Sequence, residues 1–525
     1  MDSKRIVIYD STLRDGAQAG GISYSLEDKL KIVEKLDKFG ISFIEAGNPG
    51  SNVKDQEFFS RVKKMQLKNA KLIAFGSTRR VGIKPEDDAN LKSLISAETD
   101  AVAIFGKSWD FHVKEVLKTS EDENLSMIYE TIYYLKKLGK YVVFDAEHFF
   151  DGYKNNKEYA IKTLKSAFDA GADSLDLCDT NGGTFPMEIY QITKEVTEMF
   201  PKVQIGIHCH NDTGMAVANS IMAVLAGARQ VQGTFNGYGE RCGNADLTTL
   251  IPNLQLKLGY QCIPLENIKN LTSVSRYISE IANMVPYERA PYVGAFAFTH
   301  KAGMHIDAVK KNPISFEHVN PEIVGNKRRI VLSEVAGRST VVDKIKEIDP
   351  TITKDSPQTF EIIEELKRLE NEGYQFESAE ASFEMLIRKK LGLYEPFFKL
   401  KEFKVLIDEP AREKYSSSAI VKIAVDGVNA ITAAEGDGPV HALDGALRKA
   451  LERFYPELKE VHLIDYKVRV LNAETATAAK VRVLIESSDG KDTWTTVGVS
   501  SDIVEASWIA LVDSLEYKLC KEKNN

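Results

Sequence analysis

The stretch DAGADSLDLCDTNGG, residues 169–183, contains the pattern that decides the fold. Gly171 ends a helix, the run after it is typical of a short strand, and that strand ends in polar residues. The stretch LAGARQVQGT at 225–234 repeats this order around Gly227. Units in which a helix, a glycine and a strand follow one another predict a parallel sheet built from alternating strands and helices.

Eight short β-rich runs occur in the first half of the chain, each followed by an amphipathic helical stretch. The predicted strands are Ile6–Tyr9, Phe43–Ala46, Leu72–Phe75, Ala101–Phe105, Tyr141–Phe144, Ser174–Leu177, Gln204–Ile207 and Gln230–Thr234. Their spacing is close to the roughly thirty residues that one βα unit occupies. The clearest helix begins after Ser25 and ends near Gly40. We therefore expect an α/β fold with a closed (βα)8 TIM barrel, in preference to two doubly wound domains.

The remainder of the chain divides in two. From Pro264 to Tyr394 helical periods alternate with loop-like stretches, which predicts a helical linker subdomain. Strands return near Lys401, where VKIAVDG…TAAEGDGPVHALDGALRKAL is echoed about sixty residues later by KVRVLIESSDG…TTVGVSSDIVEASWIAL. We interpret these copies as two ββα units that share one sheet. The expected division is a barrel over residues 1–263, a linker over 264–400, and an α+β domain for regulation or dimerisation over 401–525.

Composition excludes several classes of protein. The 525 residues are 43% hydrophobic and 27% charged, which is too apolar for a disordered chain. The net charge of −8 and the lack of a basic tract argue against nucleic acid or an anionic membrane as partner. Five cysteines without a C-x-x-C pair argue against a disulfide framework or a thiolate zinc site. With no apolar signal region or long apolar run, we expect a cytoplasmic protein.

The catalytic groups of a barrel lie at the C-terminal ends of its strands. The first strand ends in DSTLRDGAQ (10–18), and the seventh ends in HCHND (208–212). His208 and His210 are spaced to point to one face, and with Asp15 they could bind a divalent cation that keeps open positions for substrate oxygens. Structural, hydrogen-bonded histidines are the alternative. Asn244, in the loop after the eighth strand, could complete the ligand set, although a turn-forming role fits it as well.

Two further charged residues lie at predicted strand ends. Arg14 could direct its guanidinium at a substrate carboxylate or a developing oxyanion, or it could form a surface ion pair with Asp15. Glu147 ends the fifth strand among aromatic residues, where partial burial would suit a general base. An ion pair between Glu147 and a nearby lysine is the alternative.

Five motifs in this order closely resemble the family of α-isopropylmalate, homocitrate and citramalate synthases. These motifs are DSTLRDGAQ, DTNGG (179–183), HCHND, GYGERCGNADL (237–247) and HKAGMHIDAV (300–309). The resemblance covers almost the whole chain, including the C-terminal repeats. Within the family, KSWDFHV (107–113) and EHFFDGYKNNKEYA (147–160) are most similar to the citramalate branch, which uses pyruvate.

The resemblance implies roles for individual residues. It implies a divalent metal (Mn²⁺, Mg²⁺, Co²⁺ or Zn²⁺) bound by Asp15, His208 and His210 with Asn244 nearby. It implies Arg14 on the keto-acid carbonyl, Thr180 on its carboxylate and Glu147 beside the reacting groups. The residues expected to line the substrate pocket are Arg14, Asp15, Gln18, Phe105, Asp145 and Thr180.

The resemblance also singles out His305 over His300 as a histidine that reaches into the partner subunit's active site, which requires a homodimer. Relatives carry a tyrosine near position 316, where this chain has Phe316. His318 or water could replace its hydroxyl, or the tyrosine contributes little.

The implied reaction is a condensation of acetyl-CoA with pyruvate and water to (R)-citramalate and CoA, in isoleucine biosynthesis. Isoleucine is the expected inhibitor, with leucine as an alternative, acting through the C-terminal domain. Condensation on another 2-oxo acid remains open, as in 2-isopropylmalate synthase with 2-oxoisovalerate or in homocitrate synthase. A carbon–carbon lyase and a non-catalytic amino-acid-binding protein are the more distant alternatives.

Overall fold

The computed structural model describes residues 4–50, 53–300, 303–330, 338–376, 379–408, 416–471, 479–490 and 492–523. The chain divides into two compact units, one formed by Met1–Thr299 with Glu317–Arg329 and the other by His300–Phe316 with Ile330–Asn525. No helix among the described residues is long and apolar enough to cross a membrane.

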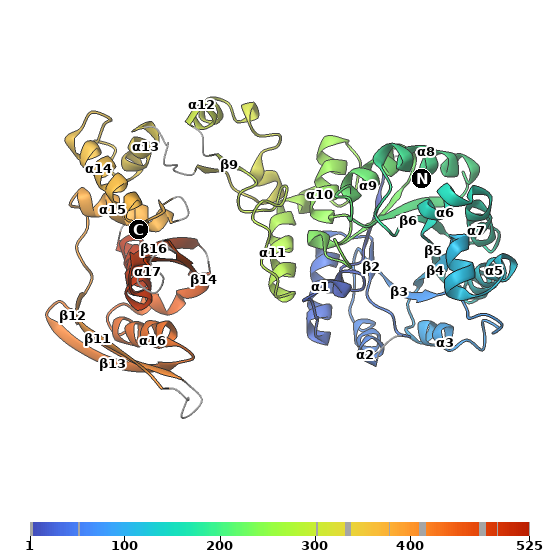
Figure 1. Cartoon of the computed structure of the whole chain (residues 1–525), viewed down its shortest axis with the longest axis horizontal. Helices are drawn as coiled ribbons and strands as arrows, with labels where there is room; N and C mark the ends of the chain where they lie inside the picture. The colour runs from blue at the N-terminus through green and yellow to red at the C-terminus, as the bar shows by residue number, and fades with distance from the viewer. Residues whose placement is uncertain are drawn as a thin grey trace. The chain divides into compact units, whose positions relative to one another are not determined.

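The first unit contains a closed barrel in which β1 to β8 pair in sequential order (Figure 1). The strands are β1 (Val7–Asp10), β2 (Phe43–Glu45), β3 (Lys71–Ser77), β4 (Ala101–Lys107), β5 (Tyr141–Glu147), β6 (Ser174–Asp179), β7 (Gln204–Cys209) and β8 (Gln230–Gly233). The pairing is parallel, and β8 closes on β1 with Ile8 opposite Val231. All eight predicted strands and the TIM barrel are confirmed.

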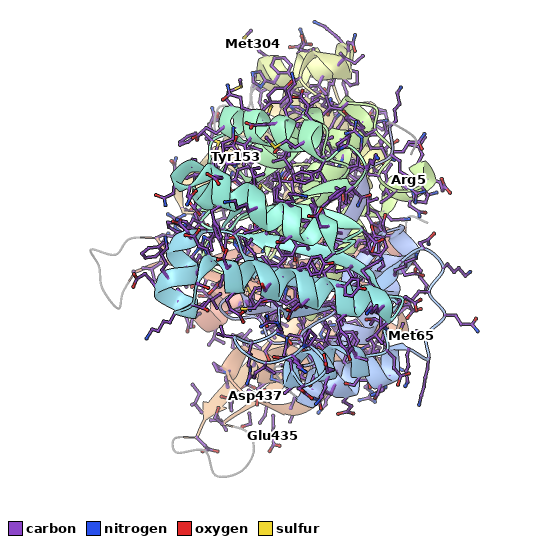
Figure 2. All side chains as sticks on the ribbon, turned by 90° about the vertical axis from the view of Figure 1, so that its right-hand side faces the viewer. Arg5, Met65, Tyr153, Met304, Glu435 and Asp437 are labelled. Carbon is purple, nitrogen blue, oxygen red and sulfur yellow. The ribbon has the colours of Figure 1, made fainter. Side chains whose placement is uncertain are left out.

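Helices cover the outside of this barrel, and Figure 2 shows several of them side by side, with Tyr153 among them. They are α1 (Leu26–Phe39), α2 (Val53–Val62), α3 (Ala89–Ser96), α4 (Asp110–His112), α5 (Glu121–Lys137), α6 (Phe149–Asn155), α7 (Lys157–Asp169), α8 (Pro186–Met199), α9 (Ala216–Leu225), α10 (Leu247–Pro252) and α11 (Leu271–Ile281). Ser25 caps α1 by accepting the Asp28 amide, and Gly40 ends it at φ 101°. The predicted start and end of this helix are therefore confirmed.

The barrel interior has two levels. At the lower level, apolar side chains that include Tyr9, Phe43 and Val143 pack together. Above them polar side chains begin, among them Asp145 and Gln232, which are 4% and 1% exposed. The lower level of the barrel interior is thus filled by apolar side chains. The interior is polar at the carboxyl ends of the strands, where the reactive groups of this fold lie.

The segment after the barrel is mainly helical, as predicted, with two two-residue strands, β9 (Thr299–His300) and β10 (Arg329–Ile330). Its further helices are α12 (Gly303–Lys311), α13 (Arg338–Ile348), α14 (Pro357–Asn371) and α15 (Glu380–Lys390).

The C-terminal part contains two repeats, and each has one strand more than the ββα unit expected. The first repeat is β11 (Lys399–Ile407), β12 (Ser417–Val425), β13 (Val428–Gly436) and α16 (Pro439–Leu451). The second is β14 (His462–Val470), β15 (Val481–Ser488), β16 (Thr493–Ser500) and α17 (Ile503–Lys523). The expectation of one shared sheet is wrong, because two three-stranded sheets form. The repeats are joined instead by apolar side chains, with Leu447 and Trp508 in one core.

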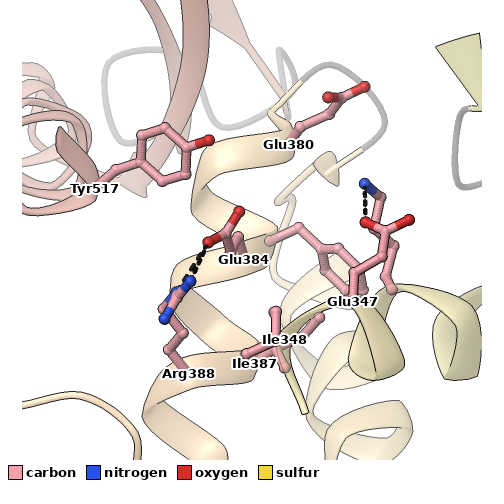
Figure 3. Close-up of a pocket in the computed structure, with 9 residues that line it drawn as sticks. Glu347, Ile348, Glu380, Glu384, Ile387, Arg388 and Tyr517 are labelled. Atoms are coloured by element: carbon pink, nitrogen blue, oxygen red, sulfur yellow. Dashed lines mark hydrogen bonds and ion pairs between the residues drawn. The ribbon is translucent and has the colours of Figure 1, made fainter. Parts of the chain in front are cut away.

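A small pocket of about 160 Å³ lies between α13, α15 and α17 (Figure 3). Ile348, Ile387 and Phe383 give it an apolar wall. Its other lining residues are Lys344, Glu347, Glu380, Glu384, Arg388 and Tyr517. Lys344 pairs with Glu347 at 2.8 Å between Nζ and Oε2, and Arg388 pairs with Glu384 at 2.7 Å between Nη2 and Oε1. The cations that line this pocket are therefore already paired with carboxylates.

Candidate active site

Three potential metal ligands meet at the carboxyl ends of β1 and β7. Asp15, His208 and His210 are buried, and one ligand atom of each lies within 4.8 Å of the others. The Asp15 Oδ2 atom is 3.6 Å from Nε2 of His208 and 3.8 Å from Nε2 of His210. Ligand atoms bound to one divalent cation at roughly 2.1 Å lie at similar separations. The structure thus brings together the three residues that were predicted from the sequence as metal ligands.

Unsatisfied polar atoms in this cluster also fit a cation. Oδ1 of Asp15, Nδ1 of His210 and Oδ1 of Asn244 are buried and have no hydrogen-bond partner among the described residues. Asn244 pairs with His210 in an isolated antiparallel bridge, and its Nδ2 donates to the Tyr238 carbonyl oxygen at 3.2 Å. Buried polar atoms without partners are costly. A carboxylate, two imidazoles and an amide oxygen form a donor set suited to a divalent metal.

The electrostatics of the cluster favour neutral imidazoles beside an ionised carboxylate. Burial raises the pKa of Asp15, but Arg14 and then the two histidines outweigh it, so that this pKa falls well below its usual value. Burial lowers the pKa of His208 and lowers that of His210 to about 4. Deprotonated imidazole and carboxylate are the forms that bind metal.

Arg14 is held at the mouth by three neighbours. Its Nε donates to Oε2 of Glu45 at 2.7 Å, its Nη1 donates to Oδ2 of Asp15 at 3.1 Å, and its guanidinium lies 3.9 Å from the centre of the Phe75 ring. Arg14 does pair with Asp15, but the pair does not lie on the surface, because only 13% of the Arg14 side chain and 4% of that of Asp15 are exposed. The contact of Arg14 with a substrate stays a prediction. Glu45, buried at the end of β2, was missed, although a carboxylate at a predicted strand end was a usable signal.

A second layer of hydrogen bonds lies beneath His208. Its Nδ1 is 2.9 Å from Oε1 of Gln232, whose Nε2 donates to Oδ1 of Asp145 at 2.7 Å and to Oδ2 of Asp176 at 2.8 Å. Burial, and then the neighbouring Asp176, raise the pKa of Asp145 well above its usual value. Burial raises the pKa of Asp176 to about 6. Sequence reasoning did not find Gln232 or Asp176, because polar residues inside a strand carry no catalytic motif.

Glu147 lies at the end of β5, opposite Lys107 at the end of β4. The two side chains form an ion pair, which is the alternative that we considered for Glu147. Lys107 is a further residue that sequence reasoning missed. Its signal was weak, since a lysine after a predicted strand is usually a surface residue.

The remaining predicted pocket residues occupy different positions. The Phe105 ring stacks on Phe75 with centroids 5.2 Å apart. The Thr180 hydroxyl oxygen accepts from the His148 amide at 2.9 Å. Gln18 is exposed in the short 3₁₀ turn after β1, so its role stays a prediction.

His305 and Phe316 belong to the second unit. The two rings stack with centroids 4.0 Å apart, and His305 is exposed whereas His300 is buried. His318, in the first unit, packs against Tyr292 with ring centroids 5.1 Å apart. The proposed reach of His305 into a partner's site stays a prediction.

Family models match three consecutive parts of the chain. Residues 5–278 match the HMGL-like family, residues 292–374 match the homocitrate synthase post-HMGL domain-like family, and residues 377–519 match the LeuA allosteric (dimerisation) domain.

Curated proteins match over nearly the whole length. The chain is 57% identical to an (R)-citramalate synthase of Aquifex aeolicus, covering 99% of each chain. It is 53% identical to one from Geobacter sulfurreducens, covering 99% of this chain and 98% of that protein. Identity to a 2-isopropylmalate synthase of Methanocaldococcus jannaschii is 33%, over 99% of this chain and 96% of that protein.

Proposed function

The chain belongs to the HMGL-like family and, over nearly its full length, to the (R)-citramalate synthases within it, and from this premise we propose that it condenses acetyl-CoA with pyruvate and water to (R)-citramalate and CoA. It is a condensing enzyme of the acyltransferase type. The observation that carries the proposed reaction is the buried cluster of Asp15, His208 and His210 with Arg14 hydrogen-bonded to its carboxylate.

Asp15, His208, His210 and Asn244 are the residues that would hold the divalent cation, and Mn²⁺, Mg²⁺, Co²⁺ and Zn²⁺ are all compatible with these donors. When bound, the ion supplies Lewis acidity toward the keto and carboxylate oxygens of pyruvate. Arg14 donates to the keto oxygen as it gains negative charge, because a positioned guanidinium stabilises a developing oxyanion. The Thr180 hydroxyl donates to the substrate carboxylate.

The residues that line the barrel mouth beside Arg14 support a small keto acid as the substrate. The stacked rings of Phe75 and Phe105 lie beside Arg14, and we propose that they limit the size of the substituent on the keto acid. One methylene contributes only ~1–3 kcal/mol to such discrimination. We assign Phe105 and Asp145 to this wall, and Gln18 to its rim.

The acetyl methyl group must lose a weakly acidic proton before it attacks the keto carbon. We assign this proton transfer to His305 of the partner subunit together with Glu147, with Lys107 holding the Glu147 carboxylate in place. The active enzyme is then a homodimer whose two sites are completed in trans. The match of residues 377–519 to a dimerisation domain supports this assembly.

The same match supports regulation. We propose that the C-terminal domain binds isoleucine, the end product of the pathway in which this step would be committed, with leucine as the alternative effector. The corresponding division is a catalytic barrel over 1–263, a linker over 264–400 and a regulatory domain over 401–525.

The test is release of free thiol from acetyl-CoA with Mn²⁺ or Mg²⁺ in excess. Pyruvate, 2-oxobutyrate, 2-oxoisovalerate and 2-oxoglutarate are supplied separately, each with and without isoleucine or leucine. Fastest release with pyruvate supports the proposal. Fastest release with 2-oxoisovalerate would instead identify a 2-isopropylmalate synthase, and release with none of the four acids would contradict the condensation itself.

A further inference from the structure

A second cluster of titratable side chains lies at the carboxyl ends of β4 and β5. It consists of Lys107, His112, Glu147, His148 and Asp151. The His112 and His148 rings meet edge to face with centroids 4.3 Å apart, and Nδ1 of His148 is 3.2 Å from Oδ2 of Asp151. The two histidines and Asp151 have no part in the mechanism proposed above, although they adjoin Glu147.

His148 is fixed by its backbone. It adopts φ 57° and ψ 33°, a left-handed conformation that costs energy for a residue other than glycine. Its amide donates to Oγ1 of Thr180 at 2.9 Å, which ties it to the proposed carboxylate-binding residue. The Gly152 amide donates to the His148 carbonyl oxygen at 2.9 Å, and Gly152 itself packs against the loop after β4, where a Cβ would lie 2.2 Å from the Ser108 carbonyl oxygen. Such strain at a barrel mouth is typical of a functional position.

Asp151 orients the imidazole. Its Oδ2 atom also accepts from Nδ2 of Asn181 at 2.9 Å, so the carboxylate is anchored from the loop after β6. With Nδ1 of His148 donating to Asp151, Nε2 carries the free lone pair. Nε2 forms no hydrogen bond to a described residue, and the side chain is 11% exposed. A carboxylate that orients an imidazole with an available Nε2 is the arrangement of a general base.

We propose that His148, oriented by Asp151, is the general base that activates water for hydrolysis of the thioester formed in the condensation; the inference rests on the proposed function. Nε2 of His148 takes a proton from water while the water oxygen bonds to the thioester carbonyl carbon. The tetrahedral intermediate collapses with cleavage of the carbon–sulfur bond. The departing CoA thiolate receives the proton from the imidazolium, which leaves a carboxylic acid and CoA.

The neighbours of His148 suit this step. Burial first, and then the proximity of His148 and Lys107, lower the pKa of His112. This shift favours the neutral form of His112, which repels an imidazolium on His148 less than a charged ring would. Glu147 is paired with Lys107 and is assigned to the earlier proton transfer, which leaves His148 for the hydrolysis.

The experiment uses the full-length variants His148→Gln and Asp151→Asn, with His441→Gln as a control in an exposed histidine of α16. Each enzyme receives Mn²⁺ and either acetyl-CoA with pyruvate or the isolated thioester, citramalyl-CoA. Quenched samples are analysed for citramalyl-CoA, citramalate and free thiol. We expect citramalyl-CoA to accumulate in His148→Gln while thiol release from either substrate falls about 100-fold. Asp151→Asn should show the same pattern with a smaller loss.

Three results would overturn the proposal. One is hydrolysis of citramalyl-CoA by both variants at the rate of the unaltered enzyme. Another is an equal loss of carbon–carbon bond formation and hydrolysis in both variants, which indicates a structural role. If His148→Gln does not fold, Asp151→Asn decides between these outcomes. In the third, the unaltered enzyme forms neither thioester nor thiol from any 2-oxo acid and does not hydrolyse citramalyl-CoA. This result would also contradict the proposed function. Hydrolysis of citramalyl-CoA without condensation would contradict the proposed function alone.

Discussion

The barrel mouth and the pocket between α13, α15 and α17 both gather charged side chains, but they differ in what those side chains contact. At the mouth, Asp15, His210 and Asn244 each keep a buried polar atom without a partner among the described residues. In the pocket, Lys344 and Arg388 each pair with a glutamate, as Figure 3 shows for Arg388 and Glu384.

Whether the polar atoms already have partners distinguishes a binding site from a cluster of ion pairs. A buried polar atom without a partner loses its hydration and gains nothing in return, so it persists where a ligand completes it. Exposed ion pairs stabilise little and occur on most surfaces. Unmet hydrogen-bonding capacity is therefore a better indicator of function than charge density.

The largest effect is expected when one of the predicted metal ligands at the barrel mouth is removed. His208→Ala should lower thiol release by ~1,000-fold or more, because the several kcal/mol that a cation contributes to the transition state are lost. Titration with Mn²⁺ should show a matching loss of metal affinity. His441→Ala, a change in an exposed histidine of α16, should leave both unchanged. Unaltered turnover of His208→Ala in metal-free buffer would contradict the ligand assignment.

The second-largest effect is expected when His305, the residue that we assign to the partner subunit's active site, is replaced. His305→Ala should retain Mn²⁺ and pyruvate binding but lose ~100-fold or more in turnover, the usual contribution of a general base. Mixing it with inactive Glu147→Ala should restore activity in heterodimers, because one site then contains both intact residues. Subunit exchange that is verified but gives no rescue would show that His305 does not act across the interface.

A third test concerns the layer beneath the metal ligands. Gln232→Met and Gln230→Met each remove an amide that donates to Asp176, but only Gln232 contacts His208. Because groups behind a ligating histidine fix its orientation, Gln232→Met should weaken Mn²⁺ binding by ~10–100-fold. Gln230→Met should leave Mn²⁺ affinity close to normal. Equal losses in both variants would mean that only the stability of the polar layer matters.

The barrel could be predicted from sequence because each βα unit contains its own signals. Ser25 and Gly40 bound one helix, and apolar runs mark the strands, so eight local predictions add up to one topology. The first strand of each C-terminal repeat, β11 in one and β14 in the other, was not included in the predicted repeat units. Both strands are largely exposed and carry many charged side chains, which hides the alternation that marks a strand.

The site was predictable only where motifs follow strands. Asp15 and the two histidines are ligand types placed at strand ends, and the barrel brings strand ends together. Gln232 and Asp145 lie on different strands, and their contact depends on the register of the closed sheet. The His148–Asp151 pair depends on a left-handed backbone residue, for which the sequence EHFFD gives no signal.

Stability of the C-terminal unit should respond to pH through Glu516. Burial raises the pKa of this carboxyl to about 7, and the Tyr394 hydroxyl donates to it. In the unfolded chain Glu516 ionises near pH 4.3, so the folded state binds more protons between about pH 4 and 7. Stability therefore falls over that range, by up to ~4 kcal/mol. Glu516→Gln should flatten this dependence in thermal melts. Glu522→Gln, an exposed change in the same helix, should not flatten it.

The smallest expected effect is in the pocket. Arg388→Met breaks an i,i+4 ion pair with Glu384 that is partly exposed to water, so the free energy of unfolding should change by about 0.5 kcal/mol or less. Thiol release should stay within about twofold of normal, since Arg388 is not among the residues assigned to the reaction. The isoleucine concentration for half-inhibition should also be unaltered. A large shift in that concentration would make the pocket a ligand site despite its paired charges, and the distinction between the two regions would fail.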